Sequence, residues 1–469
     1  MLAGFAEFSV STSAPGFWRL KQRSLRVVLS IPFLVLGFWA WGQGFAGPYH
    51  FDDFVTPLND PASQSLAAWR EYLPVTLRPV TKLSYALEES LAPEVNVAAR
   101  RGVSVAIHLA AATLLYLLIM ELSIAPQSVV AGVLAAMWFL HPVHADNILL
   151  ISGRSAELAA LFLLASLLAM ERSRLWLSAL LFLLACLSRE TALAGLLPLT
   201  VLAVSRPGAT WQISRRGLFP SLLAGTVALA WILTTPRYLA LAEFSFLGRP
   251  FWSSVVAQVS AVPVGLSLLL QPGDLSIDYG LPLPSKPSDP LFLLGVVMYL
   301  AAVAGVVLLS RHHRVASVGL ALWLAALLPT QSLVPKLDAL SNRPLGLALA
   351  GLLLVTAPLL IWLLRRTLVL PRTTAAAAVS ICCVTLLAVT ASITVQRAAL
   401  FSSDLRLWQD AASKSLTNSR PYIHYALRLQ TLGRMEEAHQ TLAVARRIDP
   451  FDPALSAYLD NYRTFEVSR

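Results

Sequence analysis

The chain has 469 residues, of which 56% are hydrophobic and only 13% are charged, and its formal net charge is +10 at pH 7. A soluble chain carries about 25% charged residues, so this composition excludes a soluble globular protein and indicates a polytopic membrane protein. The excess Lys and Arg lie in short loops between apolar runs, which is the positive-inside pattern, so we reject nucleic-acid binding. Cys186, Cys382 and Cys383 lie in apolar segments and predict neither disulfides nor a thiolate metal site.

A membrane-spanning helix needs about 20 largely apolar residues. The candidate segments are residues 25–46, 103–122, 129–140, 156–170, 175–187, 192–204, 218–234, 255–270, 291–309, 316–328, 345–364 and 375–395. If all of them crossed, the basic clusters at residues 311–314 and 365–372 would face outward, against the positive-inside rule. If residues 255–270, or the neighbouring residues 236–250, form a re-entrant or interfacial segment instead of a span, both basic clusters return to the inside. We therefore predict an all-α bundle with about eleven spans.

The ends of the chain are assigned from charge. Arg19, Lys21, Arg23 and Arg26 precede the first apolar segment without a cleavage site, which predicts an uncleaved signal anchor with a cytoplasmic N-terminus. An odd number of spans then places the C-terminus outside. The low Lys content relative to Arg, with much Ala and Leu, indicates a bacterial inner membrane, so the outside would be the periplasm.

Two adjacent carboxylates, Asp52 and Asp53, follow the first apolar segment. They begin the loop 47–101, which is about fifty residues long where connections of about 4–6 are usual, and long outer loops often cover a site. Adjacent acids in an extended loop point in different directions, so one can face a pocket while the other binds an amide, a cation or a metal. The pair suits a general base with its orienting partner, although a solvated acidic loop tip explains it equally well.

With this topology the unusual polar residues collect on the outer side, whereas the inner loops are mainly basic. Ionisable groups gathered at one edge of a membrane domain are a functional-site hypothesis. They are Arg78, His141, His144, Asp146, Arg154, Arg189, Glu190, Arg237, Glu243, Arg249, Asp274, Asp278, Tyr279, Lys336, Asp338, Asn342 and Arg343.

Residues 1–396 are predicted to form the membrane domain and 397–469 an outer helical tail. Residues 419–452 fit one tetratricopeptide repeat of about 34 residues, with Ala426 and Ala438 at the small positions and Pro450 at the turn. A single repeat rarely folds, because stacking of repeats buries its core. The tail is therefore expected to be either a cap docked on the membrane domain or a platform for a protein partner.

Several motifs, in order along the chain, resemble those of the transmembrane and tetratricopeptide-repeat O-mannosyltransferases, a family of the GT-C class of glycosyltransferases. They are Tyr49-His50-Phe51-Asp52-Asp53-Phe54, Arg78-Pro79-Val80-Thr81, Phe139-Leu140-His141-Pro142-Val143-His144-Ala145-Asp146, Ser152-Gly153-Arg154, Leu187-Ser188-Arg189-Glu190-Thr191 and Leu275-Ser276-Ile277-Asp278-Tyr279. The chain departs from the family in Arg189, where Lys is usual, in a loose match over Ser341-Asn342-Arg343-Pro344-Leu345, and in its short repeat array.

The resemblance implies a GT-C-type fold and inverting transfer of a sugar, mannose, from a polyprenyl phosphate to a protein Ser/Thr hydroxyl on the outer face. Asp52 or Asp53 would be the base. Arg154, Lys336 and Arg343 would hold the leaving phosphate, since Arg matches phosphate oxygens in a bidentate manner. Arg78, His141, His144, Glu190 and Asp278 complete the predicted substrate site. No cofactor is implied.

Other roles remain open for several of these residues. His141 and His144 can face one site, where they could hold a divalent metal, bind the phosphate or orient an aspartate. Glu190 could pair with Arg189 or Arg154 instead of acting in catalysis. The Asp278-Tyr279 and Arg78-Pro79 turns could serve only to shape or pin their loops.

Two functions of other classes compete with the enzyme. A transporter or flippase for an anionic lipid would use the same cations, but it predicts repeat symmetry or polar residues at mid-span, and the helix interiors are plain Leu, Ala and Val. A catalytically inactive anchor that displays the tail to a partner would need neither Asp52 nor Asp53. The donor sugar, and a lipid or glycan acceptor in place of protein, also remain open.

Overall fold

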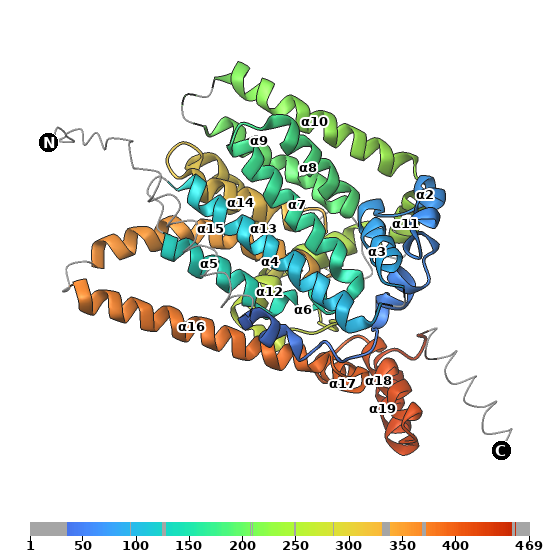
Figure 1. Cartoon of the computed structure of the whole chain (residues 1–469). Coiled ribbons are helices and arrows are strands. Elements are labelled where there is room, and N and C mark those ends of the chain that lie inside the picture. Colours follow the sequence, from blue (N-terminus) through green and yellow to red (C-terminus); the bar gives the residue numbers. More distant parts are fainter. Residues whose placement is uncertain are drawn as a thin grey trace.

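The protein, seen as a computed structural model, is a bundle of helices without a strand among the residues described (Figure 1). These residues are 35–93, 95–123, 128–206, 208, 210–247, 250–284, 286–330, 338–367, 372–452 and 455. The predicted all-α class is confirmed for this part of the chain. An α-helix pairs its backbone N–H and C=O groups within itself, and this is necessary in a membrane because lipid offers no hydrogen-bonding partners.

Long helices make up the body of the bundle (Figure 1). They are α4 (Val97–Leu122), α5 (Ser128–Leu140), α7 (Arg154–Glu171), α8 (Leu175–Ser188), α9 (Leu196–Val204), α10 (Trp211–Thr234), α12 (Phe251–Leu270), α13 (Pro290–Leu309), α14 (Arg314–Leu327), α15 (Asn342–Thr367) and α16 (Arg372–Leu400). Within the described ranges, seven helices are long and apolar enough to cross a membrane, or eight if the bent pair Ser128–Leu140 and Pro142–Ile148 is one span. A multi-pass membrane protein, as the composition predicts, is therefore supported.

The predicted number of about eleven spans includes shorter segments. Leu175–Ser188, Glu190–Val204 and Arg314–Leu327 are apolar helices of 10–17 residues, below the length of a full span. Most of the first predicted segment, 25–46, lies outside the described residues. The number of spans therefore stays a prediction.

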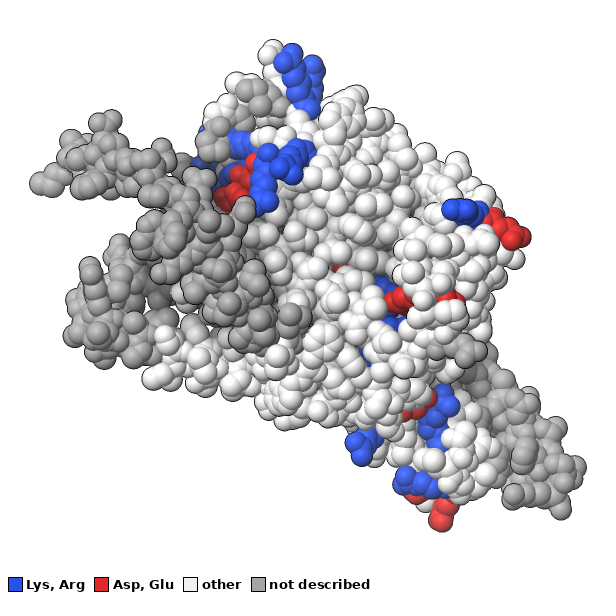
Figure 2. All heavy atoms as spheres, in the orientation of Figure 1, with Lys and Arg blue, Asp and Glu red and all other residues white. Residues whose placement is uncertain are grey.

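Basic loops that were predicted to lie inside meet at one end of the bundle. Glu171 at the end of α7 accepts from Arg314 at 2.7 and 2.5 Å, and its backbone carbonyl accepts from Arg206 at 2.5 Å. Arg172 pairs with Glu121 at the end of α4. In Figure 2, Lys and Arg atoms gather at the upper left, and a broad uncharged surface separates them from the charges at the lower right. The ends of α4, α7 and α9 and the start of α14 therefore lie together.

The pair of helices α11 (Pro236–Leu247) and α12 returns to the end at which it starts. The Tyr238 hydroxyl in α11 accepts a hydrogen bond from the backbone N–H of Arg78, and the Leu269 carbonyl in α12 faces His141 at 3.0 Å. Arg78 and His141 belong to the predicted outer side. These contacts favour the re-entrant alternative for this region.

The first outer loop and the tail lie at this same end (Figure 1). The loop folds into short helices: η1 (Phe51–Asp53), η2 (Phe54–Leu58), η3 (Pro61–Ser63), α2 (Leu66–Tyr72), η4 (Leu73–Val75) and α3 (Pro79–Leu91). Short helices also break the chain between long ones: η5 (Pro142–His144), α6 (Ala145–Ile148), η6 (Ile151–Gly153), η7 (Glu190–Gly195) and η8 (Pro272–Asp274). The tail consists of α17 (Asp404–Lys414), α18 (Arg420–Thr431) and α19 (Met435–Ile448). It is docked on the bundle, as one of the two predicted alternatives requires.

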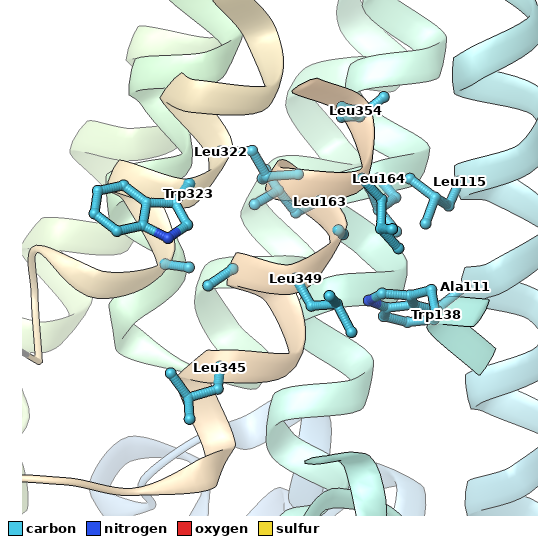
Figure 3. Packing of buried hydrophobic residues seen from close by; sticks show 14 of the residues in the cluster. Ala111, Leu115, Trp138, Leu163, Leu164, Leu322, Trp323, Leu345, Leu349 and Leu354 are labelled. Carbon is cyan, nitrogen blue, oxygen red and sulfur yellow. The ribbon is translucent and has the colours of Figure 1, made fainter. Parts of the chain in front are cut away.

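Close packing of α14 against α15 forms the centre of the bundle. Leu322 and Trp323 of α14 lie beside Leu345, Leu349 and Leu354 of α15 in Figure 3, and all five are buried. In lipid, helices associate through van der Waals contact, and small residues let their backbones approach closely. Gly319 and Gly351 provide that approach here, because a Cβ added to either one would lie 2.5–2.6 Å from the other's carbonyl oxygen.

We predict that Gly319→Val or Gly351→Val destabilises the bundle by about 1–3 kcal/mol or more, because the added methyl groups must push two backbones apart. Gly132→Val in α5 is the matched control, since nothing lies within 4 Å of a Cβ there. Thermal unfolding midpoints of the detergent-solubilised proteins measure the difference. Equal midpoints for the α14 and control variants would contradict the packing described.

Candidate active site

The segment that carries the two aspartates is anchored by Arg101, which is fully buried near the start of α4. Its guanidinium donates to the carbonyls of Gly44, Gly47, Pro48 and Leu149 at 2.6–2.8 Å. A guanidinium has five N–H donors, and four carbonyls here take the place of a carboxylate partner. No feature of the sequence singled out Arg101, since it lies beside a predicted apolar span like many flanking arginines.

Asp53 is the buried member of the pair. Its side chain is fully buried, Oδ1 accepts from the Ser152 N–H at 2.8 Å, and Oδ2 accepts from the His50 N–H at 3.3 Å. Burial raises the pKa of the Asp53 carboxyl above its ordinary value, and the two N–H donors oppose that rise. Asp53 thus joins the loop to η6, which is the orienting half of the predicted arrangement.

Asp52 is the accessible member of the pair. Its side chain is 40% exposed, and Oδ2 accepts from Nη2 of Arg343 at 2.7 Å. Arg343 lies in the first turn of α15 and also reaches the Ser152 hydroxyl at 3.4 Å. The two aspartates therefore do point in different directions: one reaches solvent and a cation, and the other reaches the backbone.

A narrow pocket with an apolar wall leads to Arg343. Small and apolar side chains from α7, η7, α14 and α15 line it, among them Ala159, Gly195 and Ala325. Two arginines, Arg189 and Arg343, also line it. The pocket has a volume of only about 30 Å³, so what it offers is its lining: an apolar wall beside two guanidinium groups that can attract an anionic group.

Arg189 belongs to the predicted outer collection of ionisable residues, but no role in binding the substrate was predicted for it. It is only 8% exposed, and its Nη1 donates to the Ser155 hydroxyl at 3.3 Å. Across the described ranges, no carboxylate lies within 4 Å of its guanidinium. A buried arginine without a close anionic partner is costly unless a ligand supplies the charge. The available signal was its position beside Glu190 at a helix end.

Arg78 and Glu190 form a bidentate ion pair at 2.9 and 2.7 Å. Glu190 therefore does not use Arg189 or Arg154, the partners considered from the sequence. Arg189 has an extended backbone (φ −157°), so its side chain and that of the next residue diverge. Arg78 precedes α3 with a left-handed backbone (φ 54°), and the pair pins the first outer loop onto η7. This is the loop-pinning alternative foreseen for the Arg78-Pro79 turn.

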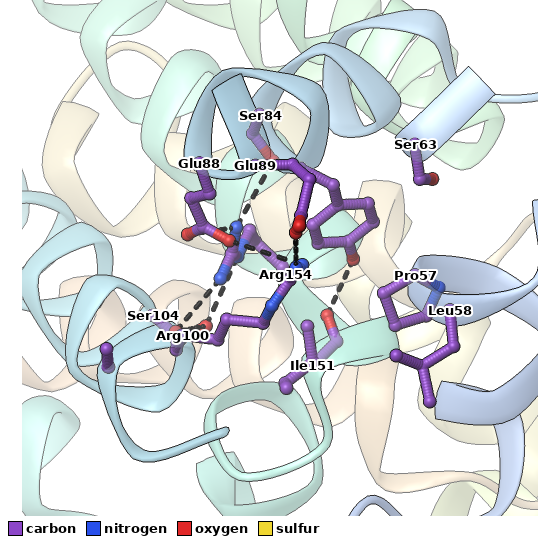
Figure 4. Close-up of polar contacts among 12 residues, drawn as sticks. Pro57, Leu58, Ser63, Ser84, Glu88, Glu89, Arg100, Ser104, Ile151 and Arg154 are labelled. Carbon is purple, nitrogen blue, oxygen red and sulfur yellow. Dashed lines mark hydrogen bonds and ion pairs between the residues drawn. The ribbon is translucent and has the colours of Figure 1, made fainter. Parts of the chain in front are cut away.

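Arg154 belongs to a separate buried cluster (Figure 4). It is fully buried, pairs with Glu88 at 2.6 Å and donates to the Arg100 carbonyl at 2.9 Å. Arg100 in turn pairs with Glu88 and Glu89. This cluster joins α3, α4 and α7. The charge of Arg154 is matched by Glu88, and Arg154 belongs to this cluster and not to the contact between Asp52 and Arg343, where the phosphate ligands are expected.

The two motif histidines do not face one site. His141 caps η5: Nδ1 accepts from the Val143 N–H at 3.2 Å, and Nε2 faces the Leu269 carbonyl. His144 turns instead toward Glu157, with Nδ1 at 3.3 Å from Oε1. His141 precedes the helical turn with an extended backbone, so the spacing of three does not align the rings.

His108, His144 and Glu157 form a fully buried triad whose ligand atoms lie within 4.8 Å of one another. These are the residues that could hold a metal ion. His108 Nδ1 lies 2.8 Å from Glu157 Oε2, and His108 Nε2 faces the Phe139 carbonyl at 3.1 Å. The Phe139 carbonyl can only accept, so Nε2 of His108 carries a hydrogen. One further proton, shared between Nδ1 of His108 and Glu157, is then enough to join the two side chains without a metal. Neither His108 nor Glu157 was singled out from the sequence.

Asp278 and Tyr279 lie between α12 and α13, in the segment called here the second outer loop, and join it to its neighbours. Asp278 accepts from Arg420 of α18 at 2.6 and 2.6 Å, so it holds the tail. The Tyr279 hydroxyl donates to Asn342 at 2.6 Å, and Asn342 donates to Asp146 at 2.8 Å. Both contacts fit the loop-shaping alternative. Lys336, the remaining predicted phosphate ligand, lies outside the described residues.

No protein-family model, curated protein or solved structure matches this chain. The resemblance described above therefore stays a prediction that depends on its motifs.

We predict that Glu88→Gln lowers the free energy of unfolding by about 3–5 kcal/mol, because it leaves the buried Arg154 charge without its partner. Glu121→Gln removes the same charge from an exposed pair with Arg172, and about 0–1 kcal/mol is expected there. Thermal unfolding in detergent, compared with wild type, measures both. Similar losses in the two variants would show that Arg154 does not depend on Glu88.

Proposed function

We propose that the chain is an inverting glycosyltransferase that moves a sugar, mannose in the first instance, from a polyprenyl phosphate to an acceptor hydroxyl. The observation that carries the proposal is the contact of an accessible carboxylate, Asp52, with Arg343 at the head of an apolar pocket that also holds Arg189. These contacts support the assignment of a base and a phosphate-binding pair to one site that is bordered by an apolar wall.

Asp52 is assigned as the general base. In the transfer, the acceptor oxygen forms a bond to C1 of the sugar while the bond from C1 to the phosphate oxygen breaks. The acceptor proton passes to the Asp52 carboxylate, and attack from the face opposite to the phosphate inverts C1. Asp53 is assigned as the orienting partner, because its oxygens are engaged by backbone N–H groups and are inaccessible.

Arg343 and Arg189 are assigned to the phosphate. The leaving lipid phosphate gains negative charge as the C1–O bond breaks, and guanidinium groups match its oxygens geometrically. Arg343 would exchange part of its contact with Asp52 for the phosphate, which frees the carboxylate to accept a proton. Arg189 has no close carboxylate to give up, so it offers its charge directly.

The acceptor is proposed to enter from the tail side. A cavity of about 730 Å³ lies between the second outer loop and the tail, lined in part by Tyr279, Asp338, Asn418 and Arg420. We place this surface on the outer face of a bacterial inner membrane, with a protein Ser/Thr hydroxyl as the acceptor. The GT-C class and the tetratricopeptide character of α18 and α19 are parts of the same proposal.

We predict that Asp52→Asn reduces sugar transfer from radiolabelled polyprenyl-phosphate mannose by about 10²–10⁴-fold while donor binding is retained, because only the proton acceptor is lost. Asp53→Asn is the comparison: it is expected to lower stability as well as activity, since it alters a buried hydrogen-bonded group. Unchanged turnover in Asp52→Asn would exclude it as the base. If the protein were instead a lipid-phosphate transporter, Asp52→Asn would leave its transport unchanged.

We predict that Arg189→Gln weakens donor binding by about 10–100-fold, the loss expected for one charge-assisted hydrogen bond to a buried phosphate. Arg172→Gln is the control, since Arg172 is exposed at the opposite end of the bundle. Equilibrium binding of the labelled donor to purified protein measures the difference. Equal affinities for the two variants would remove Arg189 from the site.

A further inference from the structure

We propose that the C-terminal helices α17 and α18 hold the Asp52 loop in its working conformation, with Phe51 and His50 as positioning residues. This inference rests on the proposed function for its kinetic consequences, although the structural link can be tested without activity. The tail was expected to be a cap or a partner platform. Its contacts with the residues on the N-terminal side of Asp52 indicate that it is also a component of the active site.

Phe51 has a left-handed backbone with φ of 44°, immediately before Asp52. A bulky residue other than glycine adopts this conformation only where its surroundings impose it, and such residues gather at functional sites. The surroundings of the Phe51 ring come from the tail. Its centroid lies 5.7 Å from that of Trp408 in α17 and 6.0 Å from that of His424 in α18, and the Arg420 guanidinium lies 5.6 Å from it.

The surface that receives Phe51 is itself closely packed. Trp408 and His424 stack with centroids 4.2 Å apart and planes at 18°, and Trp408 is almost fully buried. Burial, and after it the charges of Arg420 and Arg428, lowers the pKa of His424 to about 4, so the ring is neutral at neutral pH. A neutral imidazole suits stacking on an indole. Arg420 is held independently by its bidentate contact with Asp278.

His50 supplies a second link from the same loop to the tail. Its ring is fully buried, Nε2 donates to the Phe401 carbonyl at 2.8 Å, and Nδ1 contacts the Asp404 carboxylate at the start of α17. Asp404 also pairs with Arg428 of α18 at 3.1 Å. The two residues before Asp52 are thus both held by the tail: His50 by polar contacts with Phe401 and Asp404, and Phe51 by aromatic contacts with α17 and α18.

The direction of the Asp52 side chain follows from these links. A change of φ at Phe51 from the left-handed to the ordinary region would rotate the chain that follows it and turn Asp52 away from Arg343. Arg101 holds the chain before His50, and the Ser152 N–H holds Asp53, but the side chains of His50 and Phe51 themselves are held by the tail. The tail therefore favours the conformation in which base and phosphate ligand meet, while Arg189 and the apolar pocket lie on other elements and do not depend on it.

Phe51→Ala in the full-length chain tests the link, because it removes the ring from the loop and leaves the core of the tail intact. Phe451→Ala is the matched control, an aromatic residue of the tail that is 89% exposed. Trp408→Ala and the conservative Trp408→Phe probe the partner surface. Hydrogen exchange of the amides of residues 49–54 reports the loop directly, and sugar-transfer kinetics report its consequence.

We expect exchange at residues 49–54 to be at least 10-fold faster in Phe51→Ala and Trp408→Ala and unchanged in Phe451→Ala. We expect kcat to fall at least 10-fold in the same two variants with donor KM within 2-fold of wild type, and Trp408→Phe to restore most of both. Unchanged exchange in Phe51→Ala overturns the proposal even if Trp408→Ala unfolds the tail. Faster exchange with unchanged kcat overturns the positioning role.

The two proposals fail in different ways. If wild type transfers no sugar from the donor, the proposed function falls, and exchange at residues 49–54 alone then decides whether the tail holds the loop. If wild type is active and Phe51→Ala raises donor KM instead of lowering kcat, the loop contributes to donor binding, and the positioning of Asp52 is overturned while the glycosyltransferase stands.

Discussion

The end of the bundle that carries the two long loops and the tail is organised by the need to pair buried charge. Removing a guanidinium from water costs several kcal/mol, which only a close partner offsets. Arg78 has Glu190, Arg154 has Glu88, and Arg420 has Asp278. Arg101 has carbonyl groups instead. Against this background Arg189 stands apart, and Arg343 has only a carboxylate that is 40% exposed. The functional assignment therefore rests on which charges the fold leaves incompletely matched.

The same pairs also explain why segments far apart in the chain form one site. Glu190 fixes the first outer loop to η7 through Arg78, and Asp278 fixes the second outer loop to α18 through Arg420. Arg397 at the end of α16 bridges Asp146 of α6 and Asp410 of α17. Each pair ties an otherwise independent loop or tail helix to the bundle. A position such as that of Asp52 can be maintained in a long loop only because its flanks are held in this way.

The sequence predicted the parts of this structure that depend on composition and periodicity. Apolar runs predicted the helices, and basic loops predicted which helix ends lie together. The prediction that the one-sided collection of ionisable residues marks a functional site stays a prediction. Contacts between loops could not be predicted from the sequence in the same way. The spacing of His141 and His144 indicated a common site, but His141 precedes the turn with an extended backbone and the rings separate. Glu190 was considered with its neighbour Arg189, whereas Arg78, 112 residues away, reaches it. Periodicity carries no information about such long-range pairs.

Protonation is a further property that residue counts do not contain. A net charge of +10 treats all eight histidines as neutral. Both ring nitrogens of His50 face acceptors, the Phe401 carbonyl and the Asp404 carboxylate, and those of His108 face the Phe139 carbonyl and Glu157. A neutral imidazole can donate from only one nitrogen, so each arrangement contains one additional proton shared with its carboxylate. These two pairs, one beside Asp52 and one beside the His144 turn, are therefore links in which a ring and a carboxylate share a proton. They give Asp404 and Glu157 a hydrogen-bonding partner, as the arginines do for Glu190, Glu88 and Asp278.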